Sequence, residues 1–431
     1  RLVAATYKAA KQADPNAQIG LTVASYDPAY LRQTILALKR IGAANSFDYL
    51  CIHPYELADG LVDRDGEIAF LSMAPAIRTM LKAEAPEHAD AEIWITEVGR
   101  KLDPRKAHGA TEKDAAEAFA KIYLMALAQG IKRIQWFEAQ DPPGEEAGFG
   151  LLKRDGSPRA AYTALKTLHE HLGASPEYLG WAALGEDRRG FGFVFRGAKG
   201  PVLAAWSPQG EIGSRKMPPD CGFAFDATTG EELARPHNVF WSFAAAPQLL
   251  PNPPADLVAE AQANKSQPFP WGGDFSQAAS VVFQAGASGF VEPSQGVMQT
   301  NQRSTPLITF PDGSSGLYVR ANQGTTFSVH PTFADFDDSE FYVRVTVRRL
   351  EATNIGMNVF FAAADGQGRS PYKNVGTWFG LNSSDDWQTH TWRVQGASLC
   401  KLWGFDFSLR PEQSAPFAIG KVEVSKTPFA N

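Results

Sequence analysis

The residue best suited to chemistry in this sequence lies where a short apolar run ends. Glu97 comes two residues after the apolar run 93–95, and Gly99 then breaks the pattern. We therefore expect Glu97 at the C-terminal end of a β-strand. In α/β folds, functional sites are built at this end of the strands.

Two other predicted strands end in polar or aromatic side chains. His53 and Tyr55 end one strand, and Trp136 and Glu138 end another. If the strands are parallel, these side chains gather with Glu97 at one rim of the sheet. A carboxylate beside aromatic and imidazole groups suits sugar chemistry, because an oxocarbenium-like transition state needs a nearby anion and sugar rings stack on aromatic faces.

Each of these residues also has a structural interpretation. Glu97 could cap the loop after its strand, His53 could be a buried imidazole bonded to the backbone, and Trp136 could belong to the core. Glu138 fits a hydrogen-bonding group at the rim better than an acid/base catalyst.

The elements that must position these residues alternate between strand and helix over residues 1–173. Such alternation predicts parallel strands joined by right-handed crossovers. The clearest helix has Thr111 as its expected N-cap and Gly130 as its expected stop. The four expected strands lie within residues 17–25, 47–55, 91–98 and 131–139.

Beyond residue 173 the pattern becomes all-β. Alternating runs joined by Gly-rich turns predict a small β-sandwich over residues 174–249. Residues 250–273 are rich in Pro, so we expect a linker. Residues 274–431 contain enough alternating runs for a jelly-roll sandwich, and this domain resembles the general carbohydrate-binding jelly roll.

The first 173 residues resemble a known family. "WITEVG" resembles the seventh-strand nucleophile motif of clan A retaining glycoside hydrolases, "FDYLCIHPYE" the sixth strand, and "IQWFEAQDP" the eighth. The nearest similarity is to family 39, the β-xylosidase and iduronidase-like enzymes. The resemblance implies a multidomain chain, with the C-terminal half of a (β/α)8 TIM barrel followed by two all-β sandwich domains. It also implies that Glu97 is the catalytic nucleophile and that His53, Tyr55, Trp136 and Glu138 bind substrate.

One departure from the family pattern concerns the acid/base residue. Clan A enzymes carry it as a Glu in an Asn-Glu motif at the end of the fourth strand, and this sequence has no Asn-Glu pair at a predicted strand end. Four strands also cannot close an eight-stranded barrel. The sequence opens within an amphipathic helix, so we expect the first half-barrel, with the acid/base, to come from an N-terminal segment or a separate chain.

Composition narrows the alternatives. A net charge of −6 without long basic runs argues against nucleic acid or an anionic membrane as the main partner, and no apolar run is long enough to span a bilayer. The three cysteines are far apart and show no metal-ligand spacing, so they imply neither a disulfide framework nor a zinc site. The mechanism that the resemblance implies needs no metal or organic cofactor. The partner expected is a carbohydrate, and the expected location is extracellular or at the cell surface.

Two other interpretations stay open. The chain could be a non-catalytic glycan-binding or extracellular matrix protein on a glycosidase scaffold, since a fold does not guarantee activity. Residues 1–173 could instead form a complete open α/β domain with a binding role. In the terminal domain, a sugar-stacking platform and a role in the core are alternatives for four tryptophans: Trp378, Trp387, Trp392 and Trp403.

Overall fold

The chain divides into two compact units. One contains residues 1–27, 45–74 and 91–271, and the other contains residues 28–44, 75–90 and 272–431. The computed structural model describes residues 1–23, 26, 28–62, 66–102, 110–143, 148–185, 190–208, 212–218, 222–233, 240–267, 269, 275, 278–285, 296–299, 307–321, 325–329, 333, 340–351, 355–362, 372–374, 379–381, 386–395, 406–411 and 415–430.

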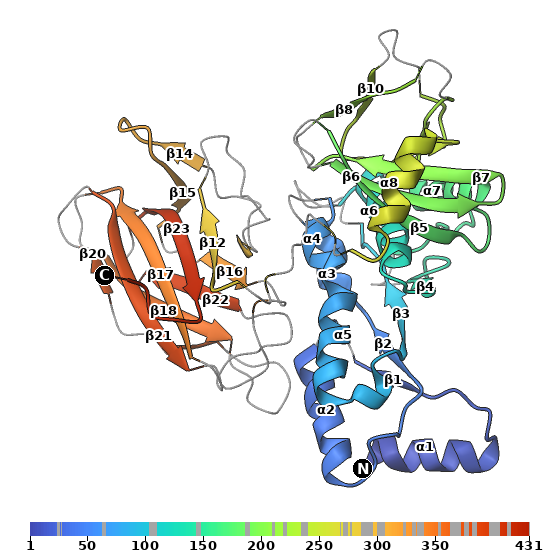
Figure 1. The fold of residues 1–431 in the computed structure, drawn as a ribbon, viewed down its shortest axis with the longest axis horizontal. Coiled ribbons are helices and arrows are strands. Elements are labelled where there is room, and N and C mark those ends of the chain that lie inside the picture. Colours follow the sequence, from blue (N-terminus) through green and yellow to red (C-terminus); the bar gives the residue numbers. More distant parts are fainter. Residues whose placement is uncertain are drawn as a thin grey trace. The chain divides into compact units, whose positions relative to one another are not determined.

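The first unit contains a four-stranded parallel sheet, as the alternation of strand and helix predicted (Figure 1). Its order among the described residues is β1-β2-β3-β4, so β1 and β4 are the edges. The strands are β1 (Gly20–Thr22), β2 (Tyr49–Ile52), β3 (Glu92–Val98) and β4 (Arg133–Trp136). The order along the sheet follows the order along the chain, but four strands do not by themselves show a half-barrel.

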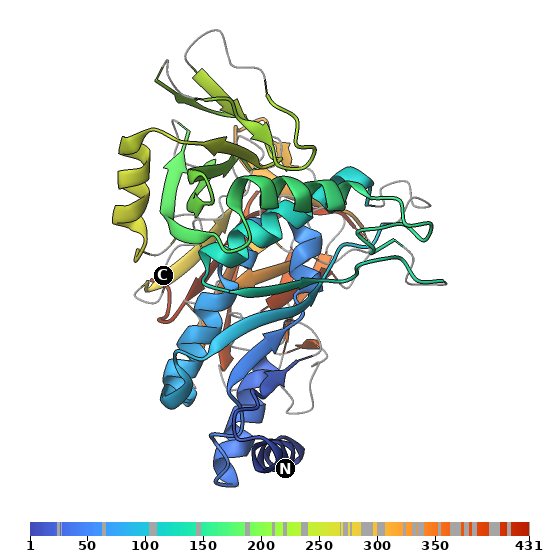
Figure 2. The ribbon, with the colours of Figure 1, turned by 90° about the vertical axis from the view of Figure 1, so that its right-hand side faces the viewer.

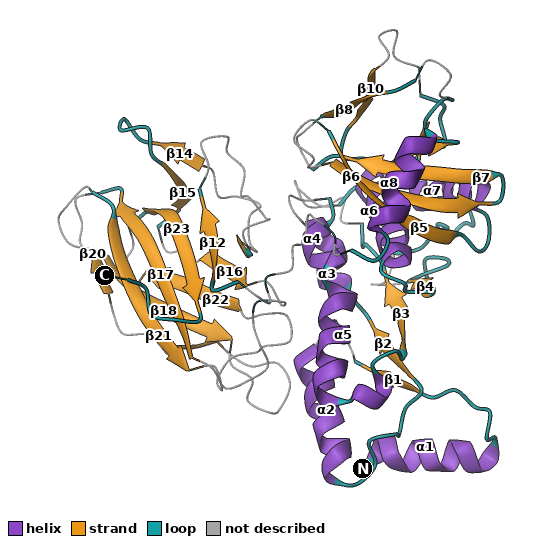
Figure 3. Ribbon diagram, in the orientation of Figure 1, coloured by secondary structure: helices purple, strands orange, loops and turns teal. Residues whose placement is uncertain are grey.

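Among the described residues, helices α1 to α7 lie within the first 173 positions and α8 follows later; Figure 3 draws the helices in purple. The helices that fall in the first unit are α1 (Leu2–Ala13), α3 (Tyr55–Gly60), α4 (Gly66–Leu71), α6 (Glu112–Ala128), α7 (Ala160–Leu172) and α8 (Ala255–Asn264). The second unit holds α2 (Pro28–Arg40), most of α5 (Met73–Glu84) and a 3-10 turn, Pro86–His88. Within the second unit, Arg32 Nε of α2 donates to Glu84 Oε1 of α5 at 2.7 Å.

Helix α6 begins and stops where the sequence predicted. The Thr111 hydroxyl accepts a hydrogen bond from Asp114 N, and the Asp114 carboxylate accepts one from Thr111 N, which completes a capping box. Gly130 follows the helix with a φ of +78°, a conformation that glycine adopts without strain. Helices α6 and α7 lie side by side (Figure 2).

The parallel sheet has two unlike faces. The register places Leu21, Leu50 and Ile93 at neighbouring positions, and all three are buried. On the opposite face, the Trp94 ring stacks on Tyr49 at 3.7 Å between centroids, and the Arg133 guanidinium lies 4.4 Å from the Trp94 centroid. This second face is therefore aromatic and polar, and Arg133 at its edge is exposed.

The all-β part of the first unit contains a sheet of order β5-β6-β7-β11-β9 and a pair formed by β8 and β10. Their bounds are β5 (Glu177–Leu184), β6 (Gly190–Gly197), β7 (Gly200–Trp206), β8 (Gly213–Lys216), β9 (Phe225–Asp226), β10 (Phe240–Phe243) and β11 (Gln248–Pro251).

Part of the expected linker is folded, which corrects that interpretation. Within residues 250–273, helix α8 packs on β5 and buries Leu257 and Ala261 in the core of this β-region. The approach is close: a Cβ at Gly180 would lie 1.7 Å from Ala261 O. The spacing of Leu257 and Ala261 places both on one face of the helix. Burial of this apolar face stabilises a helix although prolines precede it.

The end of the second unit is a β-sandwich of two six-stranded sheets. One sheet has the order β14-β15-β23-β17-β21 with β12 beside β23, and the other has β13-β16-β22-β18-β19 with β20 beside β18. The strands are β12 (Ser280–Gln284), β13 (Val297–Gln299), β14 (Leu307–Thr309), β15 (Ser315–Val319), β16 (Thr325–Val329), β17 (Glu340–Arg349), β18 (Ile355–Ala362), β19 (Tyr372–Asn374), β20 (Phe379–Leu381), β21 (Gln388–Gln395), β22 (Asp406–Pro411) and β23 (Phe417–Ser425).

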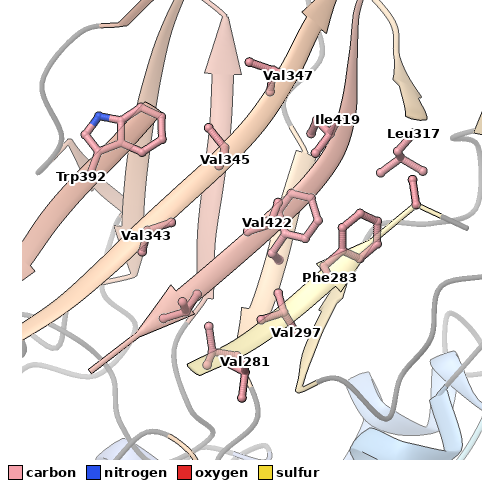
Figure 4. Close-up of a cluster of buried hydrophobic side chains, with 14 of the residues drawn as sticks. Val281, Phe283, Val297, Leu317, Val343, Val345, Val347, Trp392, Ile419 and Val422 are labelled. Carbon is pink, nitrogen blue, oxygen red and sulfur yellow. The ribbon is translucent and has the colours of Figure 1, made fainter. Parts of the chain in front are cut away.

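An apolar core fills this sandwich (Figure 4). Phe283, Val345 and Ile419 are each fully buried, and Trp392 is 2% exposed. Trp392 therefore belongs to the core, which corrects its candidacy for a sugar platform. Trp378 and Trp403 lie outside the described residues.

No helix among the described residues has the length and apolar character needed to cross a membrane.

Candidate functional site

The site is built around a hydrogen bond at the rim of the parallel sheet. Tyr55 Oη donates to Glu97 Oε2 at 3.1 Å. Tyr55 is the first residue of α3, just after β2, and Glu97 is the penultimate residue of β3. The neighbouring strands β2 and β3 thus bring together two residues that the sequence predicted at one rim.

A break in strand register lies at Glu97. Ile95 pairs with Ile134 and Val98 pairs with Trp136, so two residues of β3 face Gln135 alone. Such a bulge re-aims side chains that would otherwise alternate between the two faces. Glu97 would lie on the buried Ile95 face by strict alternation, but it is half-exposed and meets Tyr55.

His53 lies beside the same end of β3, but it bonds to a different residue of that strand. Its Nε2 and Thr96 Oγ1 share a hydrogen bond of 2.8 Å, so His53 bonds to a side chain rather than to the backbone. Thr96 directly precedes Glu97, so two consecutive residues of β3 bond to His53 and to Tyr55.

Two phenylalanines that the sequence analysis did not single out surround Tyr55. Phe137 and Phe149 meet the Tyr55 ring edge-on at 6.4 and 6.1 Å, and they meet each other at 5.4 Å. Gly99 allows this packing, because a Cβ there would lie 2.2 Å from Phe137 O. Phe137 could have been predicted at this rim, because it directly follows Trp136 at the end of a predicted strand. Phe149 could not, because it lies in a loop with no strand pattern.

Trp136 and Glu138 lie at the end of β4 in different surroundings. The Trp136 ring packs against Phe119 of α6, with 4.9 Å between centroids, and its Nε1 donates to Phe149 O. Glu138 is half-buried, and its backbone oxygen accepts from Leu151 N. The structure thus places Trp136 against a helix, while the ring of the next residue, Phe137, meets Tyr55.

A buried aspartate anchors the loop that carries Phe149. Asp141 Oδ1 accepts hydrogen bonds from Gly148 N at 2.9 Å and Gly150 N at 2.7 Å, and Asp141 Oδ2 binds Arg159. Burial alone would raise the pKa of Asp141, but the bonds from Arg159 and from the two backbone amides outweigh it and lower the pKa. The carboxylate therefore stays ionised between Arg159 and the loop.

Glu97 is a better candidate nucleophile than the Cys51 thiol of β2, which is buried and forms no disulfide. Burial raises its pKa, and the hydrogen bond with Thr96 compensates only in part. A protonated thiol is a poor nucleophile. In the part of the chain that the structure describes, no group of three or more His, Cys, Asp or Glu residues could hold a metal ion.

Comparison with known proteins gives distant similarities. No protein family model and no curated protein matches the chain. Among solved structures, the xylan-binding domain CBM22-1 of Xyn10C from Paenibacillus barcinonensis is 12% identical, with a TM-score of 0.26, over 34% of this chain and 92% of that one. The C-terminal CBM6 of LamC from Zobellia galactanivorans is 9% identical, with a TM-score of 0.22, over 34% of this chain and 98% of that one.

A third similar structure holds the CBM22-1 and GH10 modules of a Clostridium thermocellum endo-1,4-β-D-xylanase. It is 12% identical with a TM-score of 0.28, and the match covers 36% of this chain and 29% of that one. These similar structures contain carbohydrate-binding modules, but such identities and TM-scores assign neither a fold nor a ligand to this chain. The resemblance to family 39 stays a prediction.

Proposed function

We propose that the chain is part of a retaining glycoside hydrolase acting on a polysaccharide or glycoconjugate, with Glu97 as nucleophile. The observation that carries the proposal is the hydrogen bond from Tyr55 to Glu97 at the C-terminal rim of a parallel sheet. The bond fixes one carboxylate oxygen and leaves the other to attack an anomeric carbon. The aromatic neighbours Phe137 and Phe149 support the rim on one side.

In this mechanism Glu97 forms a covalent glycosyl-enzyme while an acid about 5 Å away protonates the leaving oxygen. Water then attacks the anomeric carbon, the same acid acts as base, and Glu97 is released. Tyr55 orients the carboxylate through the cycle, and the reaction needs no metal or organic cofactor. An enzyme of this type acting on extended glycans would work outside the cell or at its surface.

The acid/base would come from a preceding segment or a separate chain that forms the first half of a barrel. Two features of the sheet favour such a partner. Within the described part of the chain, β1 and β4 are the edges of the sheet, and edge strands can pair with further strands. All-parallel sheets are ordinarily covered on both faces, whereas the face that carries Trp94 ends in the exposed Arg133.

The test is covalent labelling of the protein together with any such segment. A 2-fluoro glycoside inactivator, chosen by screening aryl glycosides, should add one sugar to Glu97, located by peptide mass spectrometry. Glu97→Gln should not be labelled and should lose about a thousandfold or more of the turnover. Labelling of another residue, or a variant that keeps more than about a tenth of the activity, would refute the assignment.

A second candidate function is glycan binding without catalysis, which an aromatic group on the terminal sandwich favours. The half-buried Trp387 meets Phe310 edge-on at 5.4 Å, and Arg348 lies 4.2 Å from the Phe310 centroid. Aromatic rings and guanidinium groups at a surface are suited to sugar contacts. Affinity electrophoresis in a panel of polysaccharides tests this: Trp387→Ala should remove any retardation that the unmodified chain shows.

A further inference from the structure

The short helix α3, which begins at the Tyr55 of the candidate site, is held at its other end by two cations. Arg100 Nη1 donates to Asp59 O at 2.7 Å and contacts Asp59 Oδ1 at 3.3 Å. Lys121 Nζ donates to Leu61 O, at the C-cap of the helix, at 2.9 Å. The last carbonyls of a helix have no donors within it, so these two side chains supply the missing hydrogen bonds.

Both cations are buried, which distinguishes them from ordinary surface caps. The Arg100 side chain is 4% exposed and that of Lys121 is 0% exposed. Burying a charge costs several kcal/mol unless it is well paired. Hydrogen bonding to a carbonyl alone does not offset this cost: Arg100 also pairs with the Asp59 carboxylate, and Lys121 needs support from carboxylate partners of its own.

Two carboxylates supply that support for Lys121. Its Nζ lies 2.7 Å from Glu67 Oε1 of α4 and 2.8 Å from Glu117 Oε1 of α6. Burial by itself would lower the pKa of Lys121, but the two carboxylates outweigh it and raise the pKa. Lys121 is therefore a permanent cation that links α3, α4 and α6.

The end of β3 contacts α3 at both ends of the helix. Glu97 accepts a hydrogen bond from Tyr55, the first residue of α3, and Arg100 donates to Asp59 in its last turn. Six residues of helix span only about 9 Å. A tilt or slide of about 1 Å in so short a helix would break the 3.1 Å bond at its first residue.

We propose that Arg100 and Lys121 are positioning residues, which fix α3 so that Tyr55 Oη stays on Glu97. The catalytic consequence rests on the proposed function, but the position of Tyr55 does not. In the competing interpretation, the two cations stabilise the fold and have no influence on the Tyr55 hydroxyl.

The test is an NMR spectrum of the full chain labelled with ¹³C at tyrosine Cζ, a nucleus that reports on hydrogen bonding of the hydroxyl. Tyr55→Phe assigns the signal, and Glu97→Ala shows where it lies without the carboxylate. Arg100→Gln should move the Tyr55 signal toward its position in Glu97→Ala, whereas Arg100→Lys, which keeps a cationic donor, should move it less.

For Lys121, the triple variant Lys121→Met, Glu67→Gln, Glu117→Gln avoids leaving carboxylates buried without a cation, and it should shift the Tyr55 signal as Arg100→Gln does. The matched control is Arg78→Gln, because Arg78 also donates to a backbone carbonyl, Ala89 O, at 2.9 Å, but in the other unit. The control should leave the Tyr55 signal in place. A folded Arg100→Gln protein with an unmoved signal would overturn the proposal.

An activity measurement separates this proposal from the proposed function. If Glu97 is the nucleophile, Arg100→Gln should lower kcat by about tenfold to a hundredfold with little change in KM, the expected effect of misplacing a catalytic group by about 1 Å. A moved Tyr55 signal without any glycoside turnover in the unmodified protein would support the positioning and refute the hydrolase. Glycoside turnover in the unmodified protein, with an unmoved Tyr55 signal in Arg100→Gln, would support the hydrolase and refute the positioning role.

Discussion

Tyr55 and Glu97 lie 42 positions apart in the sequence and are joined by a 3.1 Å hydrogen bond between a phenol and a carboxylate. The geometry is that of an oriented anion: Tyr55 holds Oε2, and edge-on contacts with Phe137 and Phe149 hold the Tyr55 ring. Removing the hydroxyl alone therefore changes the carboxylate's orientation and leaves the packing in place.

Tyr55→Phe should lower kcat on an aryl glycoside by about 10- to 150-fold, because a hydrogen bond to a charged group contributes about 1.5–3 kcal/mol. The melting temperature should change little, since the ring contacts remain. Tyr342→Phe is the matched control: it removes a similar bond, from Tyr342 Oη to Glu340 Oε2 at 3.3 Å, in the terminal sandwich. Equal losses from both variants would contradict the assignment.

Asp141→Asn should change how stability depends on pH. A carboxylate whose pKa is lowered by folding stabilises the protein above its unfolded pKa, near 3.9, and this stability is lost as the pH falls through the lower folded value. Asp141 is 5% exposed and bound to Arg159. We expect the variant to lose about 3 kcal/mol at pH 7, the lower end for breaking a buried pair, because Arg159 keeps Glu112.

Urea unfolding at pH 7, 5, 4 and 3 measures this effect. The difference between the unmodified chain and Asp141→Asn should be constant above about pH 5 and should shrink toward pH 3. Asp155→Asn is the exposed comparison: hydrogen bonds from Ser157 also lower the pKa of Asp155, but solvent screens this carboxylate, so its pH-dependent difference should be smaller than that of Asp141. A difference that stays constant down to pH 3 would show that Asp141 contributes through shape rather than charge.

Local sequence patterns were sufficient for the parallel sheet and for one helix. The apolar run 93–95 predicted β3, and Thr111 and Gly130 marked the ends of α6 as observed. Each of these signals lies within a few residues of the element it defines, so a single sequence carries it. The same signals placed Glu97 and Tyr55 at one rim, since parallel strands share the direction of their ends.

The contacts within the site could not be predicted in this way. The bulge at Glu97 depends on how β3 pairs with β4, and no residue of β3 signals it. Phe149 reaches Tyr55 because Asp141 anchors its loop, which is a tertiary contact. For α8, by contrast, a signal was present, because Pro before a helix is compatible with its start and Leu257 shares a face with Ala261.

Gly420→Ala should disturb the aromatic group on the terminal sandwich. A Cβ at this position would lie 2.8 Å from the Trp387 ring, so the indole must move away from β23 and strain its 2.9 Å bond to Ser314 Oγ. Overpacking of this kind costs about 1–3 kcal/mol. Urea unfolding followed by tryptophan fluorescence should show the loss, whereas Gly222→Ala, with its nearest atom at 3.7 Å, should not.

A double-mutant cycle identifies the cause of that loss. If the clash with the indole is responsible, Gly420→Ala should cost much less in a Trp387→Leu background, which gives a coupling energy above about 0.5 kcal/mol. Additive effects would place the cause in the backbone of β23 instead.

The terminal sandwich, residues 272–431, should fold when expressed alone. Its apolar core draws on both sheets and is formed within residues 281–424, so the fragment carries its own buried surface. We expect a single cooperative transition in urea, with matching midpoints by fluorescence and circular dichroism.

Phe283→Ala tests whether this core drives folding: the side chain is fully buried and meets Phe327 at 5.1 Å, so its loss should cost about 3–5 kcal/mol. Thr389→Ala, at an exposed position of β21, should change stability by less than about 0.5 kcal/mol. A broad, non-cooperative transition in the unmodified fragment would mean that its core needs the helices α2 and α5, which belong to the same compact unit.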